Sequence, residues 1–174
     1  MLLQQSWLPT PEENHLPAKV QVGHHDSSLL VFAEIPDIDI FNLADAPNLK
    51  TWTLGDVFEI FLQPEGRSDY LELHITPENF RLQYHFDSVG APPTTLDDGT
   101  FGSQTWIQRE EARWFVLAKI PFGILKIAPT DRLRFSFCRY DAFRSGKPPV
   151  KSSTSPHPIP KFHRPAEWGT MAFI

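Results

Sequence analysis

Prolines recur throughout this chain and constrain its fold more than any other feature. There are 17 of them in 174 residues, and they leave few windows long enough for an extended helix. Between them lie short stretches rich in aromatic and β-branched residues. Such stretches favour β-strands joined by turns. We therefore expect an all-β chain.

Strand signals follow one another along the chain. Asp56 to Leu62 is the clearest, because it is apolar, β-branched and aromatic and ends in a Gln-Pro-Glu-Gly turn. Tyr70 to Ile75 and Phe80 to Phe86 alternate apolar and polar residues with a period of two. Short turns separate these three segments, which predicts an antiparallel meander. Further strands are predicted over residues 28–35, 105–109, 113–120, 133–140 and 171–174.

These strands predict the fold class and the domain organisation. About seven to nine short strands with turns between them are typical of an antiparallel β-sandwich, here jelly-roll-like, rather than of a parallel α/β sheet. The length suits a single domain over residues 1–174. Residues 1–19 are expected to form an irregular surface segment, and residues 141–160 a Pro-rich loop.

Charge and composition argue against several classes of partner. The chain has 16 basic and 21 acidic residues, so its net charge of −5 disfavours binding to nucleic acid. No apolar stretch approaches the ~18 residues that span a bilayer, so no membrane partner is expected. Residues 1–7 do not resemble a signal peptide, and we expect a cytoplasmic location unless a leader has been removed. The single cysteine, Cys138, lies among phenylalanines and is expected to be a buried, unreactive thiol.

The central predicted strand has two faces. If Phe58, Ile60 and Leu62 face the core, Glu59 lies on the opposite face. We expect the same face to collect further polar side chains, namely Glu72, His74, Arg81, Gln83, His85 and Lys119. Such a face suits a polyhydroxylated ligand, but a solvated outer face would carry the same residue types.

Two charged residues stand in otherwise apolar strands. Glu59 follows Val-Phe and precedes Ile-Phe-Leu, and Arg139 lies in Phe-Ser-Phe-Cys-Arg-Tyr. An unpaired buried charge is strongly destabilising. We therefore predict that Glu59 pairs with Arg139 and that a sugar hydroxyl shares the pair. A purely structural salt bridge is the alternative.

The five tryptophans are candidates for stacking on the apolar face of a sugar ring. Trp52 comes just before a predicted strand and is flanked by polar residues, so it is the predicted platform. The alternative role for Trp52 is a staple over the end of the sandwich. Trp114 and Trp168 are expected in the core or at its edge.

Metal-binding signals are weak. The histidines of residues 24–26 and 157–163 lack the spacing of a zinc site. Asp37, Asp39 and Asp45 could hold a calcium ion, although Asp-x-Asp alone has little specificity.

Enzyme motifs are missing from the sequence. It contains no nucleophile elbow, phosphate-binding loop or dinucleotide-binding turn. Glu59 and Glu72 are expected on adjacent strands about 5 Å apart. A pair of carboxylates for glycoside hydrolysis therefore stays open as an alternative.

Five segments share a pattern when they are taken together and in order. They are Trp52 to Leu62, Tyr70 to Pro77, Trp114 to Phe122, Phe135 to Tyr140, and Phe162 to Gly169. In this order they resemble the strands and the closing Phe-His-x-Pro signature of family 9 carbohydrate-binding modules and their DOMON-like relatives. Ala118-Lys119 departs from the acid that the family has before Ile-Pro-Phe. The resemblance implies a β-sandwich that binds sugars without catalysis, often attached to a secreted glycoside hydrolase. Some DOMON-like relatives bind haem instead.

The sequence thus predicts a non-catalytic carbohydrate-binding module with a saccharide ligand and a glycan-processing partner protein. The candidate ligand-binding residues are Trp52, Glu59, Glu72, His74, Arg139 and Tyr140. A haem-binding domain with Met171 as an axial ligand, a small glycoside hydrolase and an interaction module stay open as alternatives.

Overall fold

The computed structural model describes residues 1–128 and 131–173. In chain order its strands are β1 (Lys19–His25), β2 (Ser28–Pro36), β3 (Val57–Pro64), β4 (Tyr70–Ile75), β5 (Arg81–Phe86), β6 (Thr94–Thr95), β7 (Gly102–Gln108), β8 (Arg113–Pro121), β9 (Leu133–Asp141), β10 (Val150–Ser153) and β11 (Gly169–Met171). The α-helix α1 (Phe122–Leu125) and the 3-10 turns η1 (Thr51–Thr53), η2 (Arg109–Glu111) and η3 (Pro165–Glu167) complete the elements. None of the helices in the described residues is long and apolar enough to cross a membrane.

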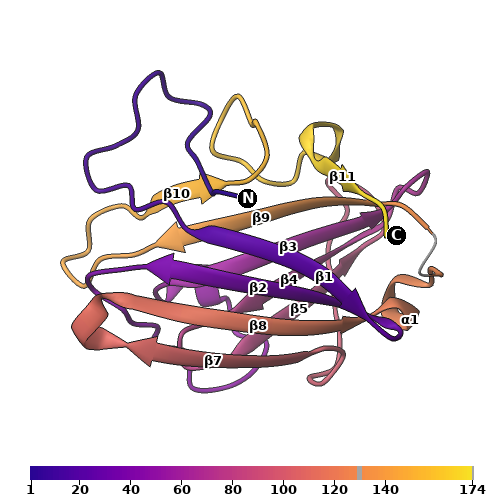
Figure 1. Cartoon of the computed structure of the whole chain (residues 1–174), viewed down its shortest axis with the longest axis horizontal. Helices are drawn as coiled ribbons and strands as arrows, with labels where there is room; N and C mark the ends of the chain where they lie inside the picture. Colours follow the sequence, from indigo (N-terminus) through magenta and orange to yellow (C-terminus); the bar gives the residue numbers. More distant parts are fainter. Residues whose placement is uncertain (129–130, 174) are drawn as a thin grey trace.

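The strands form two antiparallel sheets packed face to face (Figure 1). The smaller sheet has the order β1-β2-β8-β7, and the larger has the order β10-β9-β3-β4-β5-β6 with β11 paired to β9. The N-terminal segment and the loop after β10 lie together along one side of the sandwich, where Gln4 pairs with Ser153. The chain therefore has the antiparallel β-sandwich architecture that the strand pattern predicts.

The main core lies between the two sheets. Alternate residues of β2 and β8 are buried, as expected for a sheet with one face in the core and one in solvent. Trp114 on β8 is fully buried there, and Phe58 on β3 stacks on Phe137 of β9 from the other side. The predicted core position of Trp114 is confirmed.

Strand β3 is different, because every one of its residues is buried. One face packs in the main core, and the other packs in a second apolar cluster around Phe61, Tyr70, Phe162 and Trp168. The loop after β10 supplies Phe162 and Trp168 to this cluster. A sheet face that would otherwise be solvated is therefore partly covered, and the candidate site lies on that face.

The strands predicted between residues 28 and 140 are confirmed, and β4 has the predicted bounds. The sequence pattern missed β1, β6 and β10. β1 is an exposed edge strand in which only Val20 and Val22 alternate with polar residues, and β10 lies inside the predicted Pro-rich loop. The strand predicted over residues 171–174 is largely wrong, because β11 covers Gly169–Met171 and Ala172 and Phe173 lie outside any strand. Ile174 lies outside the described residues.

Candidate functional site

A pocket of about 600 Å³ opens on the outer face of the larger sheet. Its floor is made by Glu59 and Phe61 of β3 and Glu72 of β4. These side chains share one face because Glu59 pairs with His74 across the sheet, and Phe61 pairs with Glu72. The volume lies within the ~300–1,000 Å³ that is usual for ligand pockets.

A carboxylate–imidazole cluster lies at the pocket floor. His74 Nε2 donates to Glu72 Oε1 at 2.7 Å and lies 3.3 Å from Glu59 Oε1. On the other side of the ring, His74 Nδ1 lies 2.9 Å from Thr51 Oγ1. His74 is fully buried, whereas Glu59 and Glu72 line the pocket. A ligand can therefore reach the carboxylates directly, but His74 only through them.

The pKa values of two groups in this cluster are raised. Burial raises the pKa of Glu59 to about 8, although His74 offsets part of this rise, so Glu59 is largely protonated at pH 7. Burial by itself would lower the pKa of His74, but Glu59 and Glu72 outweigh it, so the pKa of His74 is raised. Both groups therefore hold a proton more readily than they would in water.

These groups predict how the stability of the chain depends on pH. Burial also raises the pKa of Asp56 to about 9 and that of Asp141 to about 7. A group whose pKa is higher in the folded chain stabilises fully below its unfolded pKa, and this contribution is lost as the pH rises through the folded pKa. On the acid side, the hydrogen bond from Arg164 lowers the pKa of Glu167 to about 2, so its contribution is lost as the pH falls below about 4. We expect the highest melting temperature near about pH 4 and a fall of roughly 5 °C or more by about pH 9.

Scanning calorimetry between these pH values checks this expectation. Glu59→Gln should flatten the alkaline part of the profile, because it removes a group that titrates there. Glu65→Gln is the matched control, because Glu65 is partly exposed in a surface ion pair with Arg132. A melting temperature that rises from pH 5 to pH 9 would contradict the assignment of raised pKa values.

Trp52 stands beside this cluster on the η1 turn. Its ring contacts His74 edge-on, with the ring centroids 5.4 Å apart, and the remaining surface of the half-buried indole lines the pocket. Asn42 fixes the turn, because its Nδ2 donates to the carbonyls of Thr51 and Asp56 at 3.0 Å each. The predicted platform residue is thus held rigidly beside Glu59 and Glu72.

The close approach of two backbone segments beneath Trp52 depends on Gly55. Its φ is +148°, and a Cβ atom there would lie 2.4 Å from the Phe41 carbonyl oxygen. We expect Gly55→Ala to lower the free energy of unfolding by about 3 kcal/mol, since the clash is with backbone that cannot move aside. Gly23→Ala is the control, because a Cβ at this β1 glycine would meet nothing within 4 Å. Urea denaturation of both variants measures the difference, and equal stabilities would contradict the expectation.

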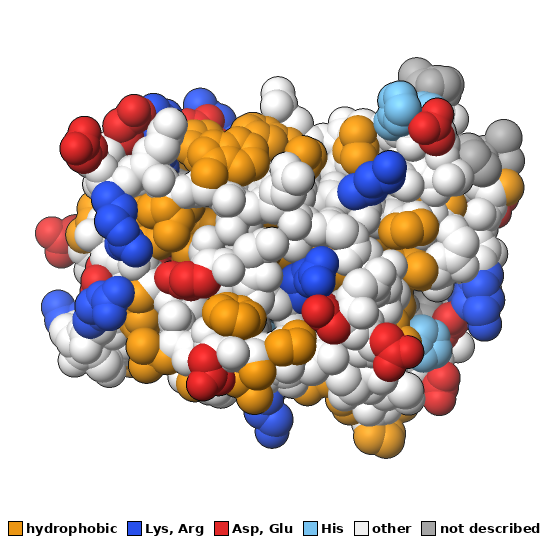
Figure 2. Space-filling model, turned by 90° about the horizontal axis from the view of Figure 1, so that it is seen from below, with side chains coloured by type: hydrophobic (Ala, Val, Ile, Leu, Met, Phe, Trp, Pro, Cys, Tyr) orange, Lys and Arg blue, Asp and Glu red, His pale blue; other side chains and the backbone are white. Residues whose placement is uncertain are grey.

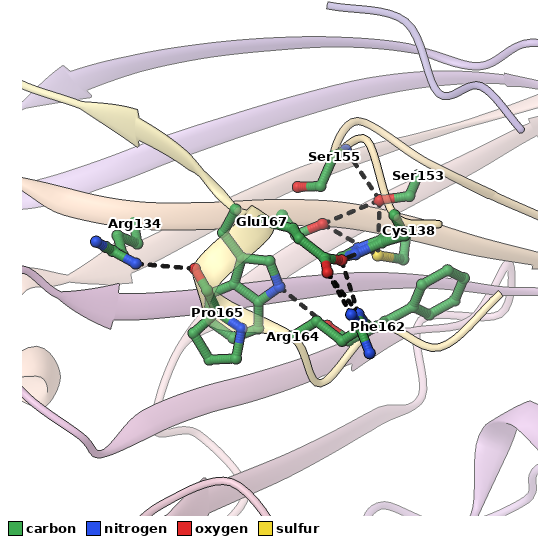
Figure 3. Close-up of polar contacts among 11 residues, drawn as sticks. Arg134, Cys138, Ser153, Ser155, Phe162, Arg164, Pro165 and Glu167 are labelled. Carbon is green, nitrogen blue, oxygen red and sulfur yellow. Dashed lines mark hydrogen bonds and ion pairs between the residues drawn. The ribbon is translucent and has the colours of Figure 1, made fainter. Parts of the chain in front are cut away.

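The loop of residues 154–168 forms a wall of the pocket. Arg164 Nε donates to the two Glu167 carboxylate oxygens at 2.7 and 2.8 Å (Figure 3). His157 Nδ1 lies 2.7 Å from Glu167 Oε2. Trp168 Nε1 donates to the Phe162 carbonyl at 2.9 Å. These bonds hold Phe162 and its neighbours against β3. The predicted position of Trp168 at the edge of a core is confirmed.

His163 closes the floor from this loop. Its Nδ1 lies 2.7 Å from the Tyr70 hydroxyl oxygen, and its Nε2 lies 3.5 Å from Glu72 Oε2. Its ring also packs against Phe61 and Phe86. Burial lowers the pKa of His163, although Glu72 offsets part of this change, so the ring is neutral at pH 7.

Arg139 does not belong to this site, and the predicted pairing with Glu59 is wrong. Arg139 lies on the inner face of β9, whereas Glu59 lies on the outer face of β3 opposite Cys138. The Nη2 atom of Arg139 lies 3.2 Å from Asp37 Oδ2 and 3.0 Å from Asp141 Oδ2. The alternation of strand residues separates the two charges, because Arg139 has the same parity as the core residues of β9.

Four further side chains predicted for the Glu59 face also lie elsewhere. The β4–β5 register pairs Leu73 with Gln83, so Arg81, Gln83 and His85 point to the inner face. A loop rather than the opposite sheet covers them there, and its Asp98 pairs with Arg81. Lys119 is exposed on the smaller sheet. On β5, the residues that line the pocket are Tyr84 and Phe86 rather than the predicted Arg81, Gln83 and His85.

Of the six candidate ligand-binding residues, the structure brings five together. Trp52, Glu59, Glu72 and Tyr140 line the pocket, and His74 lies directly beneath it. The sequence reasoning missed the aromatic walls Tyr84, Phe86 and Phe162 and the lysines Lys50, Lys151 and Lys161. Tyr84 and Phe86 alternate with Gln83 and His85 along β5, so the sequence pattern puts them on one face. The prediction assigned the other face of this strand to the site.

Among residues 1–128 and 131–173, two groups of three side chains could hold a metal ion, because one ligand atom from each side chain of a group lies within 4.8 Å of the others. They are Glu59, Glu72 and His74 at the pocket floor, and Asp37, Asp56 and Asp141 at one end of the sandwich. The guanidinium of Arg139 lies among the aspartates and supplies a cation there. Asp39, one of the predicted calcium ligands, pairs with Arg144. Calcium binding by Asp37, Asp39 and Asp45 stays a prediction. Met171, the predicted haem ligand, packs against the main core.

Comparison with known proteins shows the fold. No protein-family model matches the chain. No curated protein matches it at the level of sequence. A candidate carbohydrate-binding protein from Bacteroides uniformis has a TM-score of 0.78 at 19% identity, covering 90% of this chain and 78% of that one.

Two further structures are of a family 9 carbohydrate-binding module from Caldicellulosiruptor kristjanssonii. The complex with glucose has a TM-score of 0.66 at 19% identity, and the complex with cellotriose has 0.61 at 20%. Each covers 90% of this chain and 76% or 74% of the module. The chain therefore has the fold of these modules, as the resemblance predicts, and a DOMON-like relationship stays a prediction.

Proposed function

We propose that this chain, with the fold of a family 9 carbohydrate-binding module, binds a saccharide without catalysis in the pocket beside Trp52. The observation that carries the proposal is the partly exposed indole of Trp52 next to the buried carboxyl groups of Glu59 and Glu72 in a pocket of about 600 Å³. An indole face matches the apolar C–H face of a pyranose, and carboxyl oxygens accept hydrogen bonds from its hydroxyls.

The rest of the pocket suits the same ligand. Tyr84 and Tyr140 stand on either side of the β3–β4 floor and supply further aromatic surface for a second contact with the sugar. Glu59 and Glu72 are fixed by His74, so they are oriented before a ligand arrives, which lowers the entropic cost of binding. The Caldicellulosiruptor module was solved with glucose and with cellotriose, which supports a saccharide as the ligand class.

Calorimetric titration of the full chain with cello- and xylo-oligosaccharides tests this proposal. We expect a saturable heat with one site and a change in tryptophan fluorescence, with a dissociation constant of about 1 mM or tighter for the best ligand. An acidic oligosaccharide, trigalacturonate, is titrated as well, since the proposal concerns saccharides as a class. No heat and no fluorescence change with any of them at about 10 mM would contradict it.

A further inference from the structure

The acidic and the basic side chains of the pocket lie at different depths. The acidic ones, Glu59 and Glu72, lie at the floor and are 2% and 6% exposed. Three lysines come from three different segments of the lining: Lys50 before η1, Lys151 on β10 and Lys161 in the loop before η3. Positive charge therefore lies at the rim, on several sides of the opening.

None of these lysines forms a salt bridge within 4.0 Å in the described part of the chain, although the charge of Lys151 acts on Glu59 at the floor. Lys50 and Lys161 are exposed, and Lys151 lies over the Tyr140 ring with its Nζ 4.9 Å from the ring centroid. Arg164, the remaining basic side chain of the lining, is neutralised by Glu167. The positive charge available to a ligand is thus that of the three lysines.

This distribution departs from the rest of the molecule. The chain carries a net charge of −5 and seven lysines, of which three line this one pocket. On the face seen in Figure 2, by contrast, acidic and basic side chains are interspersed. The two floor carboxyl groups are already engaged by His74, whose Nε2 lies 2.7 Å from Glu72 and 3.3 Å from Glu59. The lysines are therefore the charged groups of the lining that are left to meet a ligand, and a rim of one sign attracts ligands of the opposite sign.

We propose that the pocket takes an acidic saccharide, with a sugar ring on Trp52 and a carboxylate or sulfate group of the saccharide among Lys50, Lys151 and Lys161. The inference rests on the proposed saccharide-binding function and names its ligand class. Ammonium groups bind either kind of anion as point charges, so carboxylated and sulfated sugars share the recognition chemistry.

Calorimetric titration of the full chain with three trisaccharides of similar length tests the inference. These are cellotriose, trigalacturonate and a sulfated cellotriose. We expect at least one acidic ligand to bind about tenfold more tightly than cellotriose at low salt, and the difference to shrink in about 0.5 M NaCl. The two acidic ligands distinguish a carboxylate from a sulfate.

Lysine variants locate the effect. Lys50→Gln, Lys151→Gln and Lys161→Gln should each weaken binding of the acidic ligand by about threefold more than they weaken binding of cellotriose, because each removes a positive charge from the pocket lining. Lys147→Gln is the matched control, because Lys147 is exposed and lies outside the pocket lining. Melting curves confirm that all four variants fold.

The outcomes separate this inference from the function on which it rests. If cellotriose binds as tightly as both acidic ligands, or salt has no effect, the acidic preference is wrong and saccharide binding stands. If none of the three ligands binds, saccharide binding itself is contradicted. If the control variant weakens acidic binding as much as the pocket variants, the lysine rim is not the source of the preference.

Discussion

Replacing Arg139 with leucine is expected to lower the free energy of unfolding by about 3–5 kcal/mol, which is a large part of the stability of a domain of this size. The guanidinium is 1% exposed and lies among three buried aspartates. It also donates to the Leu16 carbonyl at 3.2 Å, which ties down the N-terminal segment. Removing it leaves buried carboxylates without their cation.

The pH should control how large this loss is. Asp56 and Asp141 have raised pKa values, so both bind protons in mildly acidic solution. The cost of Arg139→Leu should therefore be smaller at pH 5 than at pH 8, where Asp141 is ionised. Guanidinium denaturation at both pH values measures it. Arg132→Leu is the control, because Arg132 is largely exposed and should change stability by about 0.5 kcal/mol or less. Equal losses in the free energy of unfolding for Arg139→Leu and Arg132→Leu would contradict a large contribution of the buried cluster to stability.

Replacing Trp52 with alanine is expected to weaken saccharide binding by about 30-fold or more, to below detection for a millimolar ligand. The indole of Trp52 is the largest aromatic side chain in the pocket lining, and alanine has no face on which a sugar can stack. Calorimetric titration of the variant with the best ligand measures the loss. Trp52→Phe should recover part of the affinity, because a smaller ring still stacks.

Trp106→Ala is the control for Trp52→Ala. Trp106 is 41% exposed on β7 of the smaller sheet, away from the pocket, where it stacks on Phe115. Its loss should leave affinity unchanged. If Trp106→Ala abolishes binding and Trp52→Ala does not, the site lies on the opposite sheet.

Local periodicity was sufficient to predict much of the fold. β4 has the predicted bounds because Tyr70 to Ile75 alternate cleanly and a Thr-Pro-Glu-Asn turn follows. The same alternation put Glu59 and Glu72 on one face of the sheet. It also separates Arg139 from Glu59, since Arg139 has the parity of Phe137 in the core.

The remainder of the site depends on contacts that no local pattern records. Gln83 faces inward, where the loop of residues 96–101 folds over the sheet edge. The Gln83 side chain donates a hydrogen bond to Asp98 of this loop. A strand sequence cannot reveal which loop will cover its inner face. Lys161 and His163 reach the pocket because Arg164 and Glu167 fold the last loop back onto β3. That loop has no periodicity, so its residues could be placed only from the structure.

The most direct test of the central claim is to map the bound ligand by two-dimensional ¹H–¹⁵N NMR of the labelled chain. Each tryptophan indole N–H gives its own signal, so the five tryptophans report on five places in the fold. On titration with the tightest oligosaccharide, the account predicts shifts of the Trp52 indole and of the Glu59, Glu72 and Tyr140 amides, with the Trp106 indole unchanged. Shifts centred on Trp106 and the smaller sheet, or an unchanged spectrum at saturating ligand, would contradict it.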